Sequence, residues 1–146
     1  MFKDFANISV EAMNLRCLNT LNSALEIEYT AFTENSLTAT MPVNEKTVQP
    51  LGMLHGGASL ALIETVGSMA ANLALDREKF VAVGQSVACN HFKPTKYGDK
   101  VTANALPLHV GQSTQVWEVS ITRGDGILVC KGNITMAVLP LSRNGG

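Results

Sequence analysis

The sequence predicts an α+β fold in which one antiparallel sheet wraps a single long helix. Residues 56–75 are apolar nearly all round and contain one charged residue, Glu64, as expected for a buried helix. After this helix the apolar pattern changes to the period of two that is typical of strands. The turns between these strands are too short for the crossovers that parallel pairing needs, so the sheet is predicted to be antiparallel.

Two strands and a short helix are expected before the long helix. Ser9 is a suitable N-cap for a helical segment over about residues 9–16. Residues 24–32 alternate between apolar and polar, residues 33–36 supply turn chemistry, and residues 37–41 form a second strand that Pro42 ends.

Four strands are expected after the long helix. They cover residues 80–92, 100–109, 114–122 and 127–139, and the Arg-Gly-Asp-Gly turn at 123–126 indicates a hairpin between the last two. The sheet therefore has about five to six strands. Small helix residues would let it approach closely: Gly56, Gly57, Ala58, Ser59, Ala61, Gly67, Ser68, Ala70 and Ala71.

Length and composition indicate a single domain spanning residues 1–146, with its core over about residues 24–139. Apolar residues make up 46% of the 146 residues and aromatic residues only 5%, which predicts an aliphatic core. The net charge of −1 gives no reason to expect nucleic acid or an anionic membrane as a partner.

The cysteines and the chain start favour a cytoplasmic protein. Cys17, Cys89 and Cys130 are widely spaced, and no pair has metal-ligand spacing, so we expect reduced cysteines and neither a metal site nor a cofactor. The first ten residues lack the pattern of a signal peptide. Glu64 and Asn72 argue against a membrane span over the long helix.

Glu64 is the residue most informative about function. A lone carboxylate in an apolar helix is costly unless a partner pairs with it or a reaction uses it. Gln49 to Gly57 lead into the helix and end in a histidine and two glycines. A structural pairing of Glu64 with a lysine or a backbone donor remains an alternative.

These residues resemble the motif of the hotdog-fold acyl-CoA thioesterases. The match is Gln49-Pro50-x-Gly52-x-x-His55-Gly56-Gly57, followed by Ser59, Glu64 and Ser68. The chain is most similar to the branch that holds the 1,4-dihydroxy-2-naphthoyl-CoA, enterobactin proofreading and phenylacetate-pathway thioesterases. Segments 37–43, 90–91, 107–111 and 115–117 extend the resemblance over about residues 24–139.

The resemblance implies a role for each motif residue. Glu64 would serve as nucleophile or general base, and the Gly56 N–H would polarise the thioester carbonyl. His55 and Gln49 would position that carbonyl, and Ser68 would hold the attacking water or the carboxylate. From His55 alone, a helix-capping or packing role is the favoured interpretation, and for Ser68 a space-saving role is an alternative.

The resemblance also implies a set of contacts to substrate and CoA. Arginines found in relatives at some of these places are replaced here by Lys93, Lys96 and Ser113, and exposed lysines are often merely solvated. The expected contact residues are Gly57, Thr65, Asn90, His91, Lys93, Lys96, Gly111, Gln112 and Ser113.

Helix geometry predicts that the site is shared between subunits. Glu64 follows His55 by nine residues (64 − 55), which places the two about 13 Å apart along the axis and on nearly opposite faces. One chain therefore cannot easily bring both to one thioester. We expect a homodimer as the minimal active unit, and the resemblance implies further pairing into a homotetramer.

The sequence thus favours hydrolysis of an aromatic acyl-CoA, of hydroxybenzoyl or dihydroxynaphthoyl type, to the free acid and CoA. A hotdog dehydratase or hydratase is an alternative, but its typical motifs are not visible in the sequence. A non-enzymatic acyl-CoA sensor is another, although such a module would have little need for Glu64.

Overall fold

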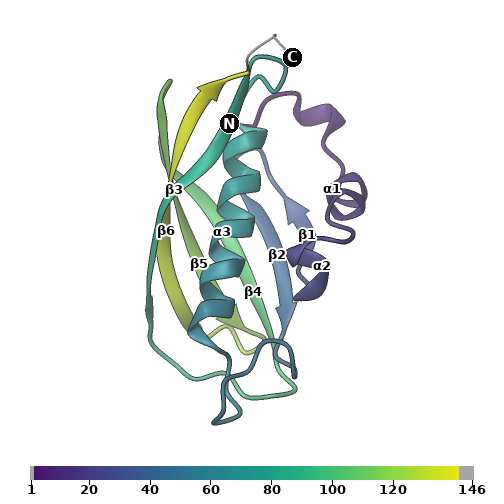
Figure 1. Cartoon of the computed structure of the whole chain (residues 1–146), viewed down its shortest axis with the longest axis vertical. Coiled ribbons are helices and arrows are strands. Elements are labelled where there is room, and N and C mark those ends of the chain that lie inside the picture. Colours follow the sequence, from purple (N-terminus) through teal and green to yellow (C-terminus); the bar gives the residue numbers. More distant parts are fainter. Residues whose placement is uncertain (1, 142–146) are drawn as a thin grey trace.

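The computed structural model describes residues 2–141 and shows one curved sheet around one long helix, α3 (Gly56–Leu73) (Figure 1). All strand pairs are antiparallel, in the order β1-β2-β4-β5-β6-β3. This confirms the α+β prediction with six strands. Their bounds are β1 Glu28–Phe32, β2 Leu37–Pro42, β3 Phe80–His91, β4 Lys100–Val110, β5 Thr114–Arg123 and β6 Leu128–Pro140.

The N-terminal region differs from the prediction at one point. A 3-10 turn, η1 (Phe5–Asn7), precedes α1 (Val10–Arg16), and Ser9 caps α1 as expected by accepting from the Ala12 N–H at 3.2 Å. The strand predicted from residue 24 begins only at Glu28. A short helix, α2 (Leu21–Ala24), occupies the preceding segment because Thr20 and Ser23 form a capping box.

The other predicted elements are present with small changes at their ends. The long helix ends at Leu73 instead of residue 75. Four of the other strands differ by one residue at one end, and β6 differs by one residue at both ends. The turn between β5 and β6 is a hairpin turn as predicted, with the Gly126 N–H donating to the Arg123 carbonyl at 2.9 Å.

The core lies between α3 and the inner face of the sheet and is mostly aliphatic, as the composition predicted. Small residues do let the sheet approach the helix. A Cβ at Gly67 would lie 2.3 Å from Ile134 Cγ2 on β6, so no side chain fits there. The sheet covers only part of α3, and Glu64 and Ser68 remain half-buried.

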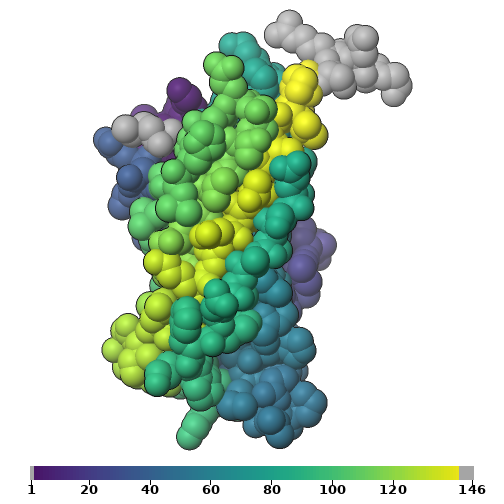
Figure 2. Space-filling model, turned by 90° about the vertical axis from the view of Figure 1, so that its left-hand side faces the viewer, coloured from purple at the N-terminus to yellow at the C-terminus, as the bar shows by residue number. Residues whose placement is uncertain are grey.

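At each edge of the sheet, an asparagine side chain satisfies the backbone groups of one residue. At β1, the Asn14 side chain bonds both backbone groups of Tyr29 at 2.9 Å and so replaces a neighbouring strand. At β3, Asn72 does the same for Ala82, also at 2.9 Å. Beyond Ala82, no strand within residues 2–141 pairs with the outer edge of β3. Figure 2 shows the outer face of the sheet, where β3 (teal) runs along the side of β6 (yellow).

No helix within residues 2–141 meets the length and apolarity needed to span a bilayer.

Candidate active site

His55 is the N-cap of α3. Its Nδ1 accepts the Gly57 N–H at 2.8 Å, which is the capping geometry that the sequence left open as an alternative. An accepting Nδ1 carries no proton, so in the neutral ring the proton is on Nε2. His55 therefore caps the helix and keeps one N–H donor for another group.

The Gly56 N–H is a second donor at the same place. As the first residue of α3, Gly56 has no intrahelical acceptor, and we find no other acceptor for it within residues 2–141. The N-terminal end of the helix dipole adds partial positive charge around this group. Together these features suit a carbonyl oxygen that gains negative charge.

Gln49 is held by a tight turn before the helix. Its Oε1 accepts the Leu51 N–H, and its backbone carbonyl accepts the Gly52 N–H at 2.9 Å. With Oε1 engaged, the amide NH₂ is the part of Gln49 that remains able to donate.

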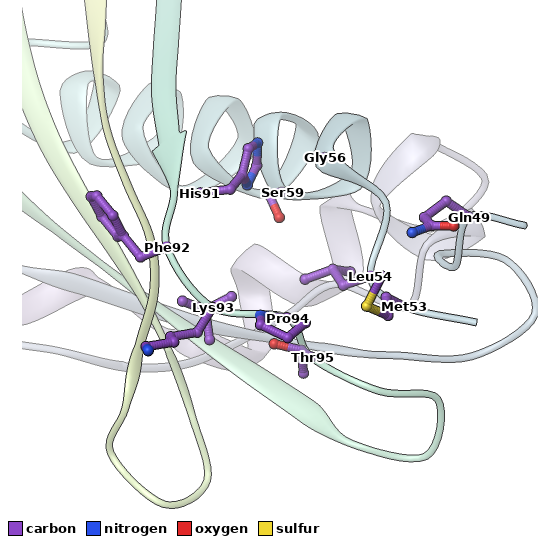
Figure 3. Close-up of a pocket in the computed structure, with 11 residues that line it drawn as sticks. Gln49, Met53, Leu54, Gly56, Ser59, His91, Phe92, Lys93, Pro94 and Thr95 are labelled. Atoms are coloured by element: carbon purple, nitrogen blue, oxygen red, sulfur yellow. The ribbon is translucent and has the colours of Figure 1, made fainter. Parts of the chain in front are cut away.

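Gln49 and Gly56 line a cavity of about 330 Å³, named the donor cavity below (Figure 3). His91, from the end of β3, lies beside Gly56 and Ser59 in that view. The remaining lining residues are Met53, Leu54, Phe92, Lys93, Pro94, Thr95 and Val129.

Glu64 lines a different cavity of about 460 Å³, named the carboxylate cavity below. Its carboxylate packs against the backbone of β3, because a Cβ at Gly84 would lie 2.4 Å from Glu64 Oε1. Burial raises the pKa of the Glu64 carboxyl above its ordinary value. Residues 2–141 offer no salt-bridge partner for Glu64, which argues against the purely structural alternative.

Ser68 and Thr65 share the carboxylate cavity with Glu64. Ser68 lies one helical turn after Glu64, as the spacing predicted. Thr65 donates its hydroxyl to Asn22 Oδ1 at 3.1 Å, so it has a structural partner.

The donor cavity and the carboxylate cavity have no lining residue in common. Within one chain, the structure therefore groups Gln49 with Gly56 and groups Glu64 with Ser68. The two cavities thus separate these donors from the carboxylate, and His55, at the N-cap next to Gly56, is not among the lining residues of either one.

Comparison with known proteins identifies the family. The family model described as the thioesterase superfamily matches residues 51–130, which include the start of α3 and Glu64. The chain belongs to the thioesterase superfamily. It has the hotdog fold of that family, as the sequence resemblance predicted.

Three similar proteins show how far the likeness extends. A Vibrio cholerae protein with an esterase name is 50% identical over 131 residues, 90% of this chain and 86% of its own. The 1,4-dihydroxy-2-naphthoyl-CoA hydrolase of Escherichia coli K12 is 38% identical over 132 residues, 90% of this chain and 96% of its own. The crystal structure of a Haemophilus influenzae thioesterase superposes with a TM-score of 0.91 at 41% identity, covering 96% of each chain.

The expected CoA contacts of this thioesterase fall into two groups. The first group lies at the end of β3 and just after it, at the end of the sheet where α3 begins: Asn90, His91, Lys93 and Lys96. Of these, His91 and Lys93 line the donor cavity. The turn at Gly111–Ser113 joins β4 to β5. The backbone carbonyl of Ser113 accepts the N–H of Val138, near the end of β6. That turn lies at the opposite end of the sheet, so the two groups are not brought together within one chain.

Sequence reasoning missed two features of this thioesterase. Arg16 ends α1 and Arg77 lies in the turn after α3, and only the fold brings them to the carboxylate cavity, so no local motif marked them. Cys89, His91 and Cys130 form a cluster that the pairing of β3 with β6 creates. Their separation along the chain hid it.

Proposed function

We propose that this thioesterase hydrolyses acyl-CoA, and that each active site combines the donor cavity of one chain with the carboxylate cavity of a second copy. The observation that carries the proposal is the separation of donors and carboxylate into two cavities with no common residue. Thioester hydrolysis needs both a base or nucleophile and donors for the developing oxyanion. Neither cavity has both.

The unpaired edge of β3 supplies a way to join the two cavities. Asn72 occupies the backbone groups of Ala82, which leaves about residues 84–91 free for antiparallel pairing with a second β3. If that segment pairs with itself about Ala88, the irregularity of β3 between Gly84 and Ser86 places His91 of one chain opposite residues 84–85 of the other. His91 packs on Gly56, and Gly84 packs on the Glu64 carboxylate. The pairing thus brings the donors of one copy toward the carboxylate of the other.

The proposed reaction follows from these positions. The thioester carbonyl oxygen accepts from the Gly56 N–H, with His55 Nε2–H and the Gln49 amide as further donors. Glu64 of the second copy takes a proton from a water molecule held by Ser68, and the resulting hydroxide attacks the carbonyl carbon. The C–S bond then breaks, and CoA leaves as a thiolate that takes up the proton. Direct attack by Glu64 followed by hydrolysis of the anhydride gives the same products.

Several finer points belong to the same proposal. Asn90, His91, Lys93 and Lys96 would contact CoA at the donor end. Gly111, Gln112 and Ser113 would do so only from another subunit, for which a homotetramer gives the opportunity.

The three free cysteines are compatible with action in the cytoplasm. The name of the E. coli relative favours an aromatic acyl group. A panel of benzoyl-, dihydroxynaphthoyl-, phenylacetyl- and fatty acyl-CoA, measured by free-thiol release, tests that preference.

Replacing Glu64 tests the chemistry. Glu64→Ala is expected to lower kcat by at least about 10²-fold, since a lost general base costs about 10²–10⁴-fold. The matched control is Glu34→Ala, which changes an exposed carboxylate on the turn before β2. Near-normal hydrolysis by the Glu64 variant would exclude the mechanism.

Hybrid dimers test the shared site. Glu64→Ala and His55→Ala chains are each expected to be inactive, but mixing them should restore activity, because a hybrid contains one site with both intact halves. At full exchange about half of the dimers are hybrids, each with one intact site, so recovery of about a quarter of wild-type activity is expected. Subunit exchange is followed by mass spectrometry of differently labelled chains. Complete exchange without recovery would place both halves of the site in one chain.

A further inference from the structure

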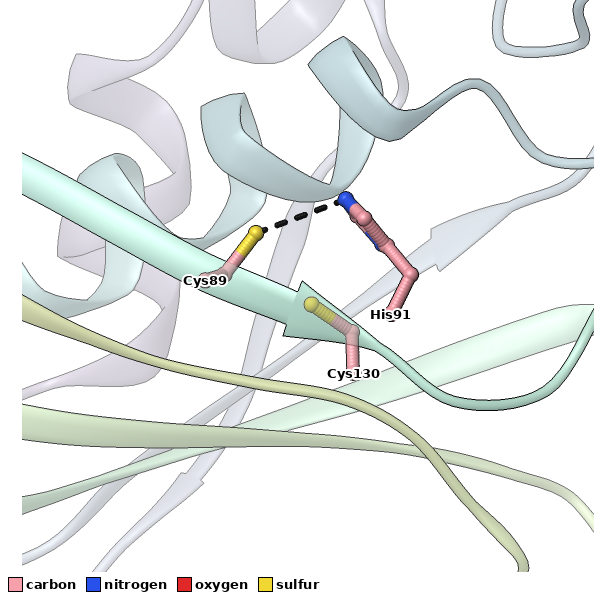
Figure 4. A group of neighbouring side chains, drawn as sticks. All are labelled: Cys89, His91 and Cys130. Atoms are coloured by element: carbon pink, nitrogen blue, oxygen red, sulfur yellow. Dashed lines mark hydrogen bonds between the residues drawn. The ribbon is translucent and has the colours of Figure 1, made fainter.

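Three side chains that commonly bind metals lie together beside the donor cavity. The ligand atoms of Cys89, His91 and Cys130 are all within 4.8 Å of one another. Figure 4 shows the three side chains converging near the start of α3. Thiolate sulfur and imidazole nitrogen are the ligands that Zn²⁺ prefers.

Strand pairing creates this cluster. Cys89 and His91 are two residues apart on β3, so their side chains point to the same face of the sheet. In the antiparallel pairing, His91 is directly opposite Cys130 on β6, and Cys89 is opposite Gly132. The three side chains therefore occupy adjacent positions on one face of two hydrogen-bonded strands.

Two glycines provide the space that the cluster occupies. A Cβ at Gly132 would lie 2.6 Å from Cys89 Cβ, and a Cβ at Gly56 would lie 3.1 Å from His91 Nε2. A side chain at Gly132 would thus displace Cys89, and one at Gly56 would crowd the imidazole.

One of the three ligand distances already matches a tetrahedral zinc site, and the other two are no longer than 4.8 Å. Cys89 Sγ and His91 Nε2 are 3.5 Å apart. Sulfur and nitrogen ligands on one tetrahedral zinc ion are about 3.6 Å apart, given bond lengths of about 2.3 and 2.05 Å. Two sulfur ligands would be about 3.8 Å apart, so the cluster needs at most a shift of about 1 Å to close around an ion.

A disulfide fits the same residues less well. Cys89 and Cys130 are diagonal neighbours across the strand pair, not direct partners. Diagonal residues have Cα atoms about 7–8 Å apart. That exceeds the separation of about 4.4–6.8 Å that disulfides usually span.

We propose that Cys89, His91 and Cys130 bind a zinc ion with three protein ligands and one open position facing the donor cavity. Each thiol loses its proton on binding, so two protons are released for each ion bound. His91 cannot serve as a metal ligand and contact substrate at the same time. Zinc is therefore expected to inhibit hydrolysis in competition with acyl-CoA. This consequence rests on the proposed function, whereas binding itself does not.

Cobalt spectroscopy tests the binding without any assay of activity. The full-length reduced protein is titrated with Co²⁺ in the absence of substrate, and the thiolate-to-metal charge-transfer band is recorded. One ion per chain and displacement by Zn²⁺ are expected. Cys89→Ser should weaken binding by at least tenfold, since loss of even an indirect partner costs about 10–100-fold.

The matched control is Cys17→Ser, which changes a buried cysteine outside the cluster and should leave the titration unchanged. Cys130→Ala removes the ligand that lies in the core and so provides a second test of the site. Circular dichroism checks that this variant folds. Equal cobalt affinity in wild type and Cys89→Ser would overturn the site, as would a spectrum without thiolate bands.

The activity measurement separates the two claims. Zinc inhibition that acyl-CoA relieves, and that Cys89→Ser abolishes, supports both the site and its effect. A cobalt spectrum with thiolate bands alongside hydrolysis that zinc leaves unchanged would overturn the inhibition. If the protein hydrolyses no thioester at all, the proposed function fails while the cobalt titration still decides the site.

Discussion

The donor cavity and the carboxylate cavity are built in different ways. The donors at the start of α3 are backbone groups, or side chains fixed by hydrogen bonds to the backbone, such as His55 on the Gly57 N–H. Glu64 has no such support within residues 2–141, and its carboxylate rests against Gly84 on β3. The donors are held by hydrogen bonds within one chain, whereas Glu64 rests on a part of β3 whose outer edge has no strand partner within residues 2–141.

This difference indicates what dimer formation would contribute. Donors for an oxyanion work best when they are fixed before the reaction, because no reorganisation is then needed. A base also has to reach water and the substrate carbon, and pairing along β3 would fix Gly84 and so the position of Glu64. In the proposed dimer, the donors would be fixed by the fold of one chain and the carboxylate by pairing with the second.

The largest expected effect concerns His55, whose capping and catalytic roles can be separated. Asn is a strong N-cap, so His55→Asn should keep the stability of α3 while losing the Nε2–H donor. Removal of one oxyanion donor costs about 10²–10³-fold in kcat, and that loss is expected here. Free-thiol release gives the rate, and thermal unfolding gives the stability.

His55→Ala is the comparison variant for this prediction. It removes the cap as well as the donor, so it should also lose about 0.5–2 kcal/mol of stability. Wild-type turnover by His55→Asn would mean that His55 only caps the helix.

A smaller effect is expected at Gly84, which tests the carboxylate side without changing Glu64. A Cβ there would lie 2.4 Å from Glu64 Oε1, and the flexible carboxylate can move away. Gly84→Ala should therefore fold normally but lower kcat by up to about 10²-fold, the cost of a misplacement of about 1 Å. KM should change little, because the CoA contacts proposed above lie outside the carboxylate cavity.

Gly124→Ala is the matched control, since a Cβ at that position meets nothing within 4 Å. Unchanged kcat in Gly84→Ala would show that the position of Glu64 against β3 has no part in turnover.

The sequence predicted those parts of the fold that depend on a local pattern. The cap at Ser9, the long helix and the turn at Arg123–Gly126 follow from neighbouring residues, and the structure confirms them. The strand expected from residue 24 was wrong because the Thr20–Ser23 capping box outweighs a short alternation.

Long-range features were not predictable in this way. Cys89 and Cys130 are 41 residues apart (130 − 89) and meet only because β3 pairs with β6 in one register. The contact of Glu64 with Gly84 depends in the same way on how the helix lies on the sheet. The angle between His55 and Glu64, in contrast, is a property of one helix, so it could be estimated from spacing alone.

The smallest expected effect is on stability and concerns the energetic cost of Glu64. Burial raises its pKa, so the folded state favours the protonated carboxyl and is destabilised when Glu64 is ionised. Glu64→Gln should therefore stabilise the protein at neutral pH. This advantage should shrink as the pH falls through the raised pKa and vanish below the ordinary value of 4.5. Because Glu64 is only half-buried, the gain in Tm should not exceed about 2–4 °C.

Thermal unfolding of wild type and Glu64→Gln at several pH values measures this difference, with Glu34→Gln as the exposed control. A Tm gain at neutral pH, together with lost turnover, would show that Glu64 is retained for chemistry at a cost in stability. A loss of Tm at neutral pH would instead indicate that the ionised carboxylate has a stabilising partner, and the contrast between the two cavities would then disappear.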